Sequence, residues 1–439
     1  MSFIQDNRSS PSNGASKRVH LVPTPRLPLS SVCLSLIFLL YPFFVIFWLR
    51  GVVILTLMSL VVTIATDTMI NRRSLVYFKR VGLILMFYAL PMVSFIWSQW
   101  PSDTLLRSII PMMNFGLFYL SLHANWYSGG RSLVHLANWV PVYFCSISIA
   151  IFAMFGSFRN TSDHMAEILG SYANHSAAIA ILCMPITLSQ ISLRSAGVNL
   201  PTISLIACIL IAILSQSRAA MLLSIFVLVA YAVIFGANSI ERLKKLARLL
   251  AIFVPVIALM VIGLGYESTI GGVVERTTSS QVGEVLLGDS LDAREADLAR
   301  AAMYAFGLEM IYEYPVTGAG FGGLYHFMQE RLAFGIVSHN LIITFWGELG
   351  LIGLVTLFYF FYRVPKDLAD LRRQSGPDYV YKVMSAGCIV CILTFFLYGM
   401  TRPYHSNYMF PLVLGYVVHM LASWRLPTDK RSLRGMTVD

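Results

Sequence analysis

Charged residues are scarce in this 439-residue chain. Asp, Glu, Lys and Arg together make up only 12% of it, whereas hydrophobic residues make up 57%. A soluble globular domain is about 25% charged, so the shortage argues against an ordinary soluble protein. Apolar runs recur along the whole chain and are long enough to cross about 30 Å of hydrocarbon. The composition therefore predicts a polytopic membrane protein.

Low-complexity tracts and visible repeats are absent, and the six cysteines all lie within apolar segments. None lies in an outer loop, where an oxidising compartment would pair cysteines into disulfides. Cys388 and Cys391 have C-x-x-C spacing, but they share one apolar segment and no second pair accompanies them. We interpret them as small apolar filler rather than a redox or metal motif.

The fold class that we predict is an all-α integral membrane protein with about twelve transmembrane helices. No small-residue cleavage site follows the first apolar run, so we expect it to be retained rather than removed as a signal peptide. The expected parts are an N-terminal tail (1–30), helices 1–9 (31–265), a large outer loop (266–338), helices 10–12 (339–423) and a C-terminal tail (424–439). The predicted spans are 31–49, 52–69, 81–98, 105–122, 134–155, 174–193, 199–215, 219–236, 247–265, 339–362, 383–400 and 405–423.

Lysine is missing from one side of the predicted membrane. With both termini inside, all seven Lys and 23 of the 32 basic residues fall on the inner side, which agrees with the positive-inside rule. The basic residues are spread over many segments, which disfavours a nucleic-acid partner. The nine outer basic residues are all Arg. Chance explains this pattern about as well as phosphate binding, for which the planar guanidinium suits bidentate contact.

The outer loop 266–338 is long and polar, which makes it the first place to look for function. Within it, residues 289–314 predict a helix that has Asp289 or Ser290 as its N-cap and ends before Pro315. We expect this helix to lie at the outer membrane surface, or to pack within a small cap. Its apolar face at helical spacing consists of Leu291, Leu298, Ala302, Ala305 and Tyr312.

The sequence GAGFGG follows this helix, and Gly318, Gly320 and Gly323 fit the dinucleotide pattern G-x-G-x-x-G. No strand precedes it and no βαβ unit surrounds it, so we reject nucleotide binding. We expect a turn in which glycine lets the backbone approach a ligand, or a turn that re-enters the membrane edge.

The predicted span 339–362 opens with His339 and Asn340 and carries Glu348 deeper in. A carboxylate inside a span is costly, so we expect Glu348 to face the bundle and make a structural hydrogen bond between helices rather than to act in catalysis. His339 lies at the outer end, where an imidazole is suited to act as a general base for a hydroxyl nucleophile. A helix cap or an interface histidine is the alternative for His339.

Arg218 lies in a tight outer turn, within SQSRAAML. Either an anion binds it there, or its side chain extends to the membrane surface. Four segments resemble, in order and spacing, the motifs of the O-antigen ligase and polysaccharide polymerase superfamily. They are WSQWPSDTLLRS (97–108), SQSRAAML, YPVTGAGFGG (314–323) and SHNLIITFWGELGLIGL (338–354).

This resemblance implies a glycosyltransferase of the GT-C type in the bacterial inner membrane, with a periplasmic active site and cytoplasmic termini. The donor would be a glycan on undecaprenyl diphosphate, transferred with inversion and without a metal or other cofactor. His339 matches the essential histidine and Arg218 the motif arginine. The segment DAREADLARAAM replaces a Gly-Arg-x-x-x-Trp-like motif, so either Arg294 or Arg300 would be the second arginine.

Asn340, His175, Gly318 and Gly320 are further candidates for lining the acceptor path. The acceptor would be another lipid-linked glycan in a polymerase, which we favour, or lipid A core in a ligase. A chain-length regulator or other polysaccharide-assembly proteins are candidate partners, besides membrane lipids. A polysaccharide transporter or lipid flippase is the alternative from another class, but the sequence shows neither the repeat symmetry nor the multiple intramembrane charges expected of one.

Overall fold

A computed structural model describes residues 28–47, 50–66, 78–155, 163–193, 199–215, 217–235, 251, 291–332, 339–375, 379–401 and 408–424. All regular elements within these ranges are helical, which confirms the predicted all-α class. The elements are α1 (Leu29–Phe47), α2 (Arg50–Thr66), α3 (Phe78–Val93), η2 (Ser94–Ile96), α4 (Pro101–Arg107), α5 (Ile109–Ser128), α6 (Arg131–Phe155), α7 (Asp163–Leu193), α8 (Leu200–Leu214), α9 (Arg218–Phe235), α13 (Leu291–Glu313), α14 (Gly323–Leu332), α15 (Leu341–Ile343), the π-helical turn η4 (Thr344–Glu348), α16 (Gly350–Gln374), α17 (Tyr379–Gly399) and α18 (Met409–Trp424).

Several of these helices are long and apolar enough to cross a membrane. Four stretches meet both conditions, at 101–128, 131–154, 172–193 and 379–399, and six shorter apolar helices accompany them in the described part of the chain. These ten helices overlap ten of the predicted spans. The predicted span 247–265 lies outside the described residues except for Ala251. A total of twelve spans therefore stays a prediction.

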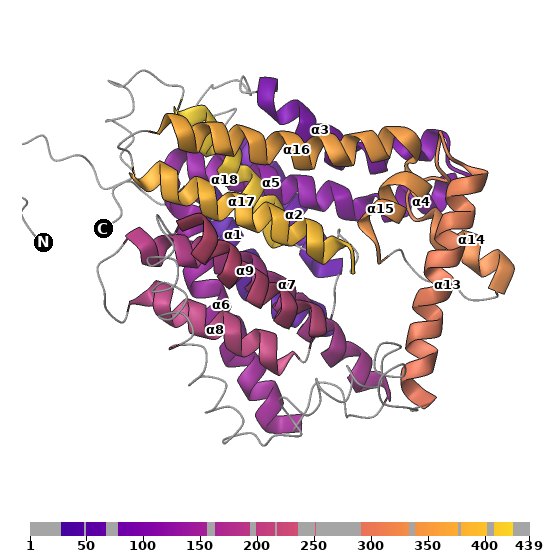
Figure 1. Cartoon of the computed structure of the whole chain (residues 1–439), viewed down its shortest axis with the longest axis horizontal. Helices are drawn as coiled ribbons and strands as arrows, with labels where there is room; N and C mark the ends of the chain where they lie inside the picture. Colours follow the sequence, from indigo (N-terminus) through magenta and orange to yellow (C-terminus); the bar gives the residue numbers. More distant parts are fainter. Residues whose placement is uncertain are drawn as a thin grey trace, which may run out of the picture.

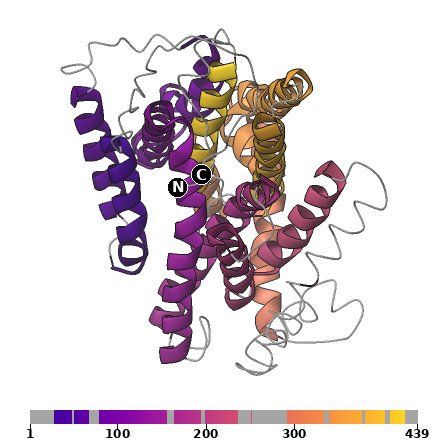
Figure 2. The same ribbon diagram turned by 90° about the vertical axis from the view of Figure 1, so that its left-hand side faces the viewer.

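The long helices form a bundle whose members run side by side (Figure 1). The indigo helices nearest the N-terminus lie along one side of it (Figure 2), where α2 packs against α1 and α5. Helix α7 is central, because it packs on α1, α6, α8, α9 and α17. Its residues from Tyr172 to Leu193 are mostly buried and apolar on every side, as expected of a helix enclosed by others.

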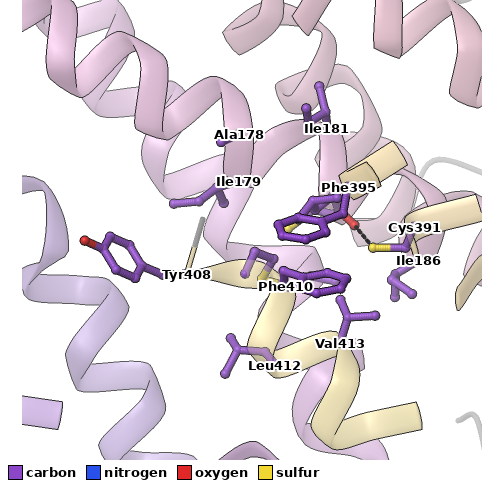
Figure 3. Packing of buried hydrophobic residues seen from close by; sticks show 14 of the residues in the cluster. Ala178, Ile179, Ile181, Ile186, Cys391, Phe395, Tyr408, Phe410, Leu412 and Val413 are labelled. Atoms are coloured by element: carbon purple, nitrogen blue, oxygen red, sulfur yellow. Dashed lines mark hydrogen bonds between the residues drawn. The ribbon is translucent and has the colours of Figure 1, made fainter. Parts of the chain in front are cut away.

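The core between α7, α17 and α18 is filled by aromatic and small residues (Figure 3). The rings of Phe395 and Phe410 stack in parallel with their centroids 3.5 Å apart. The thiol of Cys391 lies 3.4 Å from the carbonyl oxygen of Leu182, to which it donates. All six cysteines are free, and Cys388 and Cys391 are buried. Their interpretation as apolar filler agrees with this packing.

One prediction is wrong: residues 339–362 are not a single continuous helix. The chain forms the short helix α15 and the π-helical turn η4, and then passes through Gly350 at φ 71° before α16 begins. The break lets this segment pair with the glycine-rich turn. Ala319 N donates to Gly347 O (2.9 Å), Gly320 N to Glu348 O (2.8 Å) and Leu351 N to Val316 O (3.0 Å).

The helix predicted at 289–314 is present as α13 and ends one residue earlier, at Glu313. In Figure 1, α13 runs across the end of the bundle, and α14 lies beside it. We call α4, α13, α14, α15, η4 and the glycine-rich turn (residues 315–322) the end cap. The end cap contains the glycine-rich turn and Glu348, and His339 and Asn340 directly precede its helix α15.

Candidate functional site in the end cap

The segment around Trp97 and the glycine-rich turn are hydrogen-bonded to each other, although more than 200 positions separate them in the sequence. Phe321 N donates to Ser94 Oγ (3.0 Å). Gln99 N and Ser98 Oγ both donate to Ala319 O, at 3.1 and 3.3 Å. Together with the pairing to residues 347–351, these bonds bring three of the four quoted motifs into one place.

The glycines of this turn are explained by contacts with the protein itself. Gly318, Gly320 and Gly322 have φ values of 73°, 96° and 81°, which side chains rarely adopt. A Cβ at Gly318 would lie 2.5 Å from Glu348 O, and one at Gly320 would lie 2.1 Å from Ser98 Oγ. The close approach expected of these glycines is therefore an approach to protein atoms. A role of Gly318 and Gly320 in lining the acceptor path stays a prediction.

The backbone N–H groups of the turn are also occupied. Gly320 N donates to Glu348 O, and Gly322 N donates to Glu348 Oε2. Phe321 N donates to Ser94 Oγ, and Gly323 N donates to Gly320 O. A phosphate-binding loop needs such groups pointing at its ligand. The rejection of a dinucleotide-binding loop agrees with this geometry.

Glu348 lies just before α16, not deep within a spanning helix as expected. Its side chain is buried, with 3% relative exposure. Its Oε2 accepts from Gly322 N at 2.9 Å, and the carboxyl group also accepts from the backbone of Leu324. Burial raises the pKa of this carboxyl group to about 7, although the two backbone donors and Arg107 act in the opposite direction. Glu348 thus holds the glycine-rich turn against η4.

His339 is half-buried at the entrance to α15. Its backbone N lies 3.2 Å from the sulfur of Met303 on α13, to which it donates. The residue that caps α15 is Asn340, whose Oδ1 accepts from Ile342 N (2.8 Å) and Ile343 N (3.1 Å). The amide of Asn340 also donates to Met400 O at 3.4 Å, at the end of α17. The helix-cap role considered for His339 therefore belongs to its neighbour.

The three candidate arginines lie on described helices, but their side chains lie outside the described residues. Arg218 is the first residue of α9, where Ala220 N donates to Ser217 Oγ at 3.4 Å. Arg294 and Arg300 lie on α13. Arg300 is about 4.5 Å from Met303 along the helix axis, whereas Arg294 is about 13 Å from Met303. The register of α13 thus places Arg300 closer to the residue that contacts His339.

His175 packs among aromatic side chains of the bundle. Its ring stacks on that of Tyr408, which directly precedes α18, with centroids 6.1 Å apart, and it meets the ring of Tyr41 of α1 edge-on at 6.1 Å. The described contacts of His339 and Asn340 lead instead to α13 and α17. A shared acceptor path through His175 stays a prediction.

Sequence reasoning missed a charged and aromatic cluster between α4 and α14. Arg107 lies over the ring of Tyr325, with its central guanidinium carbon 4.4 Å from the centroid. Asp103 Oδ2 lies 3.0 Å from His326 Nε2. Asp103 and Arg107 are four residues apart on α4, so they share one helix face. That spacing was visible in WSQWPSDTLLRS, but nothing in the sequence indicated which partners would meet it.

The described residues contain no group of three or more His, Cys, Asp or Glu side chains that could hold a metal ion. The described apolar helices, four of which are long enough to cross a membrane, indicate a multi-pass helical membrane protein. The family model for O-antigen ligase (Wzy_C) matches residues 203–358, which supports the resemblance of this segment to the O-antigen ligase and polymerase superfamily. The matched segment contains Arg218, α13, the glycine-rich turn and His339. No curated protein matches the chain significantly.

Proposed function

We propose that this protein is an inner-membrane glycosyltransferase that transfers a glycan from undecaprenyl diphosphate to a sugar hydroxyl on the periplasmic face. The observation that carries the proposal is the position of His339. It lies at the entrance to α15, beside Met303 of α13, inside the segment matched by the O-antigen ligase family. In this position an imidazole at the membrane end can meet both a lipid-borne donor and a water-borne acceptor.

In the proposed reaction, His339 accepts the proton of the acceptor hydroxyl as the oxygen attacks the anomeric carbon. The bond from that carbon to the diphosphate oxygen breaks, and the lipid diphosphate leaves with the bonding electrons. A single displacement of this kind inverts the configuration. Arginine side chains stabilise the charge that develops on the leaving group. Arg218 is one candidate, and the register of α13 favours Arg300 over Arg294 as the other.

The acceptor that we propose is a second lipid-linked glycan, which makes the enzyme a polymerase in cell-surface polysaccharide biosynthesis. Residues 292–303 depart from the Gly-Arg-x-x-x-Trp-like pattern expected of both subfamilies. We favour a polymerase over a ligase that acts on lipid A core because a separate role in exopolysaccharide synthesis is common for such variants. The purified protein should convert lipid-linked glycan into a ladder of products on a gel. A single addition to lipid A core would identify a ligase instead. Accumulation of unchanged substrate inside vesicles would identify a transporter.

The proposed mechanism uses no metal or cofactor. The arginines supply the positive charge that a divalent cation would otherwise provide at the diphosphate. Activity should therefore survive EDTA. Loss of activity on chelation and its recovery with Mg²⁺ or Mn²⁺ would contradict the arginine mechanism, while leaving the glycosyltransferase assignment intact.

The proposed orientation has both termini in the cytoplasm and the end cap in the periplasm. It rests on the distribution of Lys and Arg. Reporter fusions after residues 75, 240 and 370 should read cytoplasmic, and fusions at 165 and 300 should read periplasmic. A cytoplasmic result at 300 would overturn the orientation and the site together.

A further inference from the structure

Helix α13 has three chemically distinct sides in the half whose side chains are described. One side is buried and packs on α15 and η4; its members are Met303, Gly307, Met310 and Ile311. The fit is close, because a Cβ at Gly307 would lie 2.8 Å from a side-chain carbon of Ile343.

The second side of α13 carries its acidic residues. Glu309 Oε1 lies 3.3 Å from Arg331 Nε, and Glu313 Oε1 accepts from Arg331 Nη2 at 2.7 Å. Arg331 belongs to α14, so these ion pairs join the two helices. The carboxylates remain partly exposed, with relative side-chain exposures of 45% and 35%. This side is suited to water.

The third side is apolar but exposed. At about 100° per residue, its members span an arc of only about 100° around the helix, which is the width of a typical apolar stripe. The relative exposure of Tyr304 is 39%, of Leu308 63% and of Tyr312 87%. Charged residues are absent from this arc between positions 301 and 313. The stripe consists of Ala301, Tyr304, Ala305, Leu308 and Tyr312, and we call it the α13 stripe.

The apolar surface continues from α13 onto α16, which packs against the apolar helix α17. Val316, just beyond α13, is 62% exposed, and its carbonyl oxygen accepts from Leu351 N at 3.0 Å. From this point α16 exposes a long apolar face: Leu351, Ile352, Val355, Phe358, Tyr359 and Tyr362. Because α16 packs beside α17, which is long and apolar enough to cross a membrane, lipid is the expected cover of this face. The surface that adjoins it at Val316 is therefore placed where lipid begins.

We propose that the α13 stripe is inserted into the membrane boundary, with lipid as its occupant. The second half of α13, with an apolar stripe on one side and carboxylates on the other, suits a position in the interface plane. Tyrosines suit the same level, because their rings are apolar and their hydroxyl groups remain hydrated. The course of α13 across the end of the bundle fits this position (Figure 1).

Insertion of the stripe has a consequence for the candidate site. Tyr304 faces lipid, and the preceding residue, Met303, contacts His339. Helix α13 then lies between the lipid and His339, and a lipid-linked donor would pass along this helix to reach His339. This second step rests on the proposed function, whereas insertion of the stripe does not.

Site-directed spin labelling of the full chain in liposomes tests the insertion. Leu308→Cys and Tyr312→Cys place the label on the stripe. Glu309→Cys is the matched control, because residue 309 is next to residue 308 in the chain but lies on the acidic side of the helix. Both stripe positions are exposed, so the substitutions leave the packed side of α13 intact. Unsubstituted protein gives the background from the native cysteines, five of which are buried.

The stripe labels should collide more with oxygen, which concentrates in lipid, than with a water-soluble nickel complex. The label at position 309 should show the opposite preference. Equal access of the nickel complex to positions 308, 309 and 312 would overturn the proposal, because the helix would then stand in water. Protection of the stripe labels from both reagents would also overturn it, because protein rather than lipid would then cover the stripe.

Discussion

Replacing Glu348 by glutamine should make the protein more stable at pH 8 and change its stability little at pH 5. In the folded protein, burial raises the pKa of this carboxyl group from an ordinary value of 4.5 to about 7. The difference corresponds to about 3 kcal/mol, since one pKa unit corresponds to about 1.4 kcal/mol. A side chain that cannot ionise avoids this cost.

The sign follows from proton binding. Between pH 4.5 and pH 7 the carboxyl group is largely protonated in the folded state and largely ionised in the unfolded state. The folded state therefore binds more protons, and stability falls as the pH rises through this window. Above about pH 7 the loss is complete. Glutamine keeps an oxygen that can accept from Gly322 N, but it loses the second acceptor, which offsets the gain by about 1 kcal/mol.

Thermal unfolding in detergent, followed by intrinsic tryptophan fluorescence between pH 5 and pH 8, measures this effect. The wild-type midpoint should fall as the pH rises relative to that of Glu348→Gln. Glu330→Gln is the matched control, because its exposed carboxylate accepts from Trp100 Nε1 and glutamine preserves that bond. A Glu348→Gln variant that is less stable than wild type by the same amount at every pH would refute the reasoning. Its turnover, measured in the ladder assay, should stay close to wild type.

Three further variants test the site and the turn. His339→Ala should fold and still bind the lipid diphosphate, but lose about 10²–10⁴-fold in turnover; near-normal turnover would remove His339 from the mechanism. Arg218→Lys should lose most activity at normal protein levels because the bidentate contact is gone, and wild-type activity in Arg218→Ala would return this residue to a membrane-surface role. Gly318→Ala should lower the unfolding midpoint, because its φ of 73° costs a side chain about 1–2 kcal/mol and its Cβ would overlap Glu348 O. Gly82→Ala is its control, since a Cβ there meets nothing within 4 Å; equal midpoints in the two variants would contradict the proposed packing.

The sequence alone was enough to predict most of the helices. A chain in lipid must satisfy its backbone hydrogen bonds internally, so a long apolar run is almost always a helix. Predicted spans such as 134–155 and 383–400 agree with α6 and α17 to within a few residues. The end of α13 was predictable for an equally local reason: Pro315 disfavours helical backbone at the residue before it. The order of motifs pointed to the family, because those residues lie close together along the chain.

Only the tertiary structure decided how the segment after His339 runs. Gly347, Gly350 and Gly353 are equally typical of close helix packing and of a broken helix, so their spacing could not distinguish the two. The break occurs because backbone groups of residues 316–320 bond to those of residues 347–351. Side-chain hydropathy cannot predict such pairing, because these hydrogen bonds are formed by backbone groups, which nearly every residue has. Glu348 therefore looked like a costly charge inside a span, whereas the fold places it ahead of α16, where the N–H of Gly322 meets it.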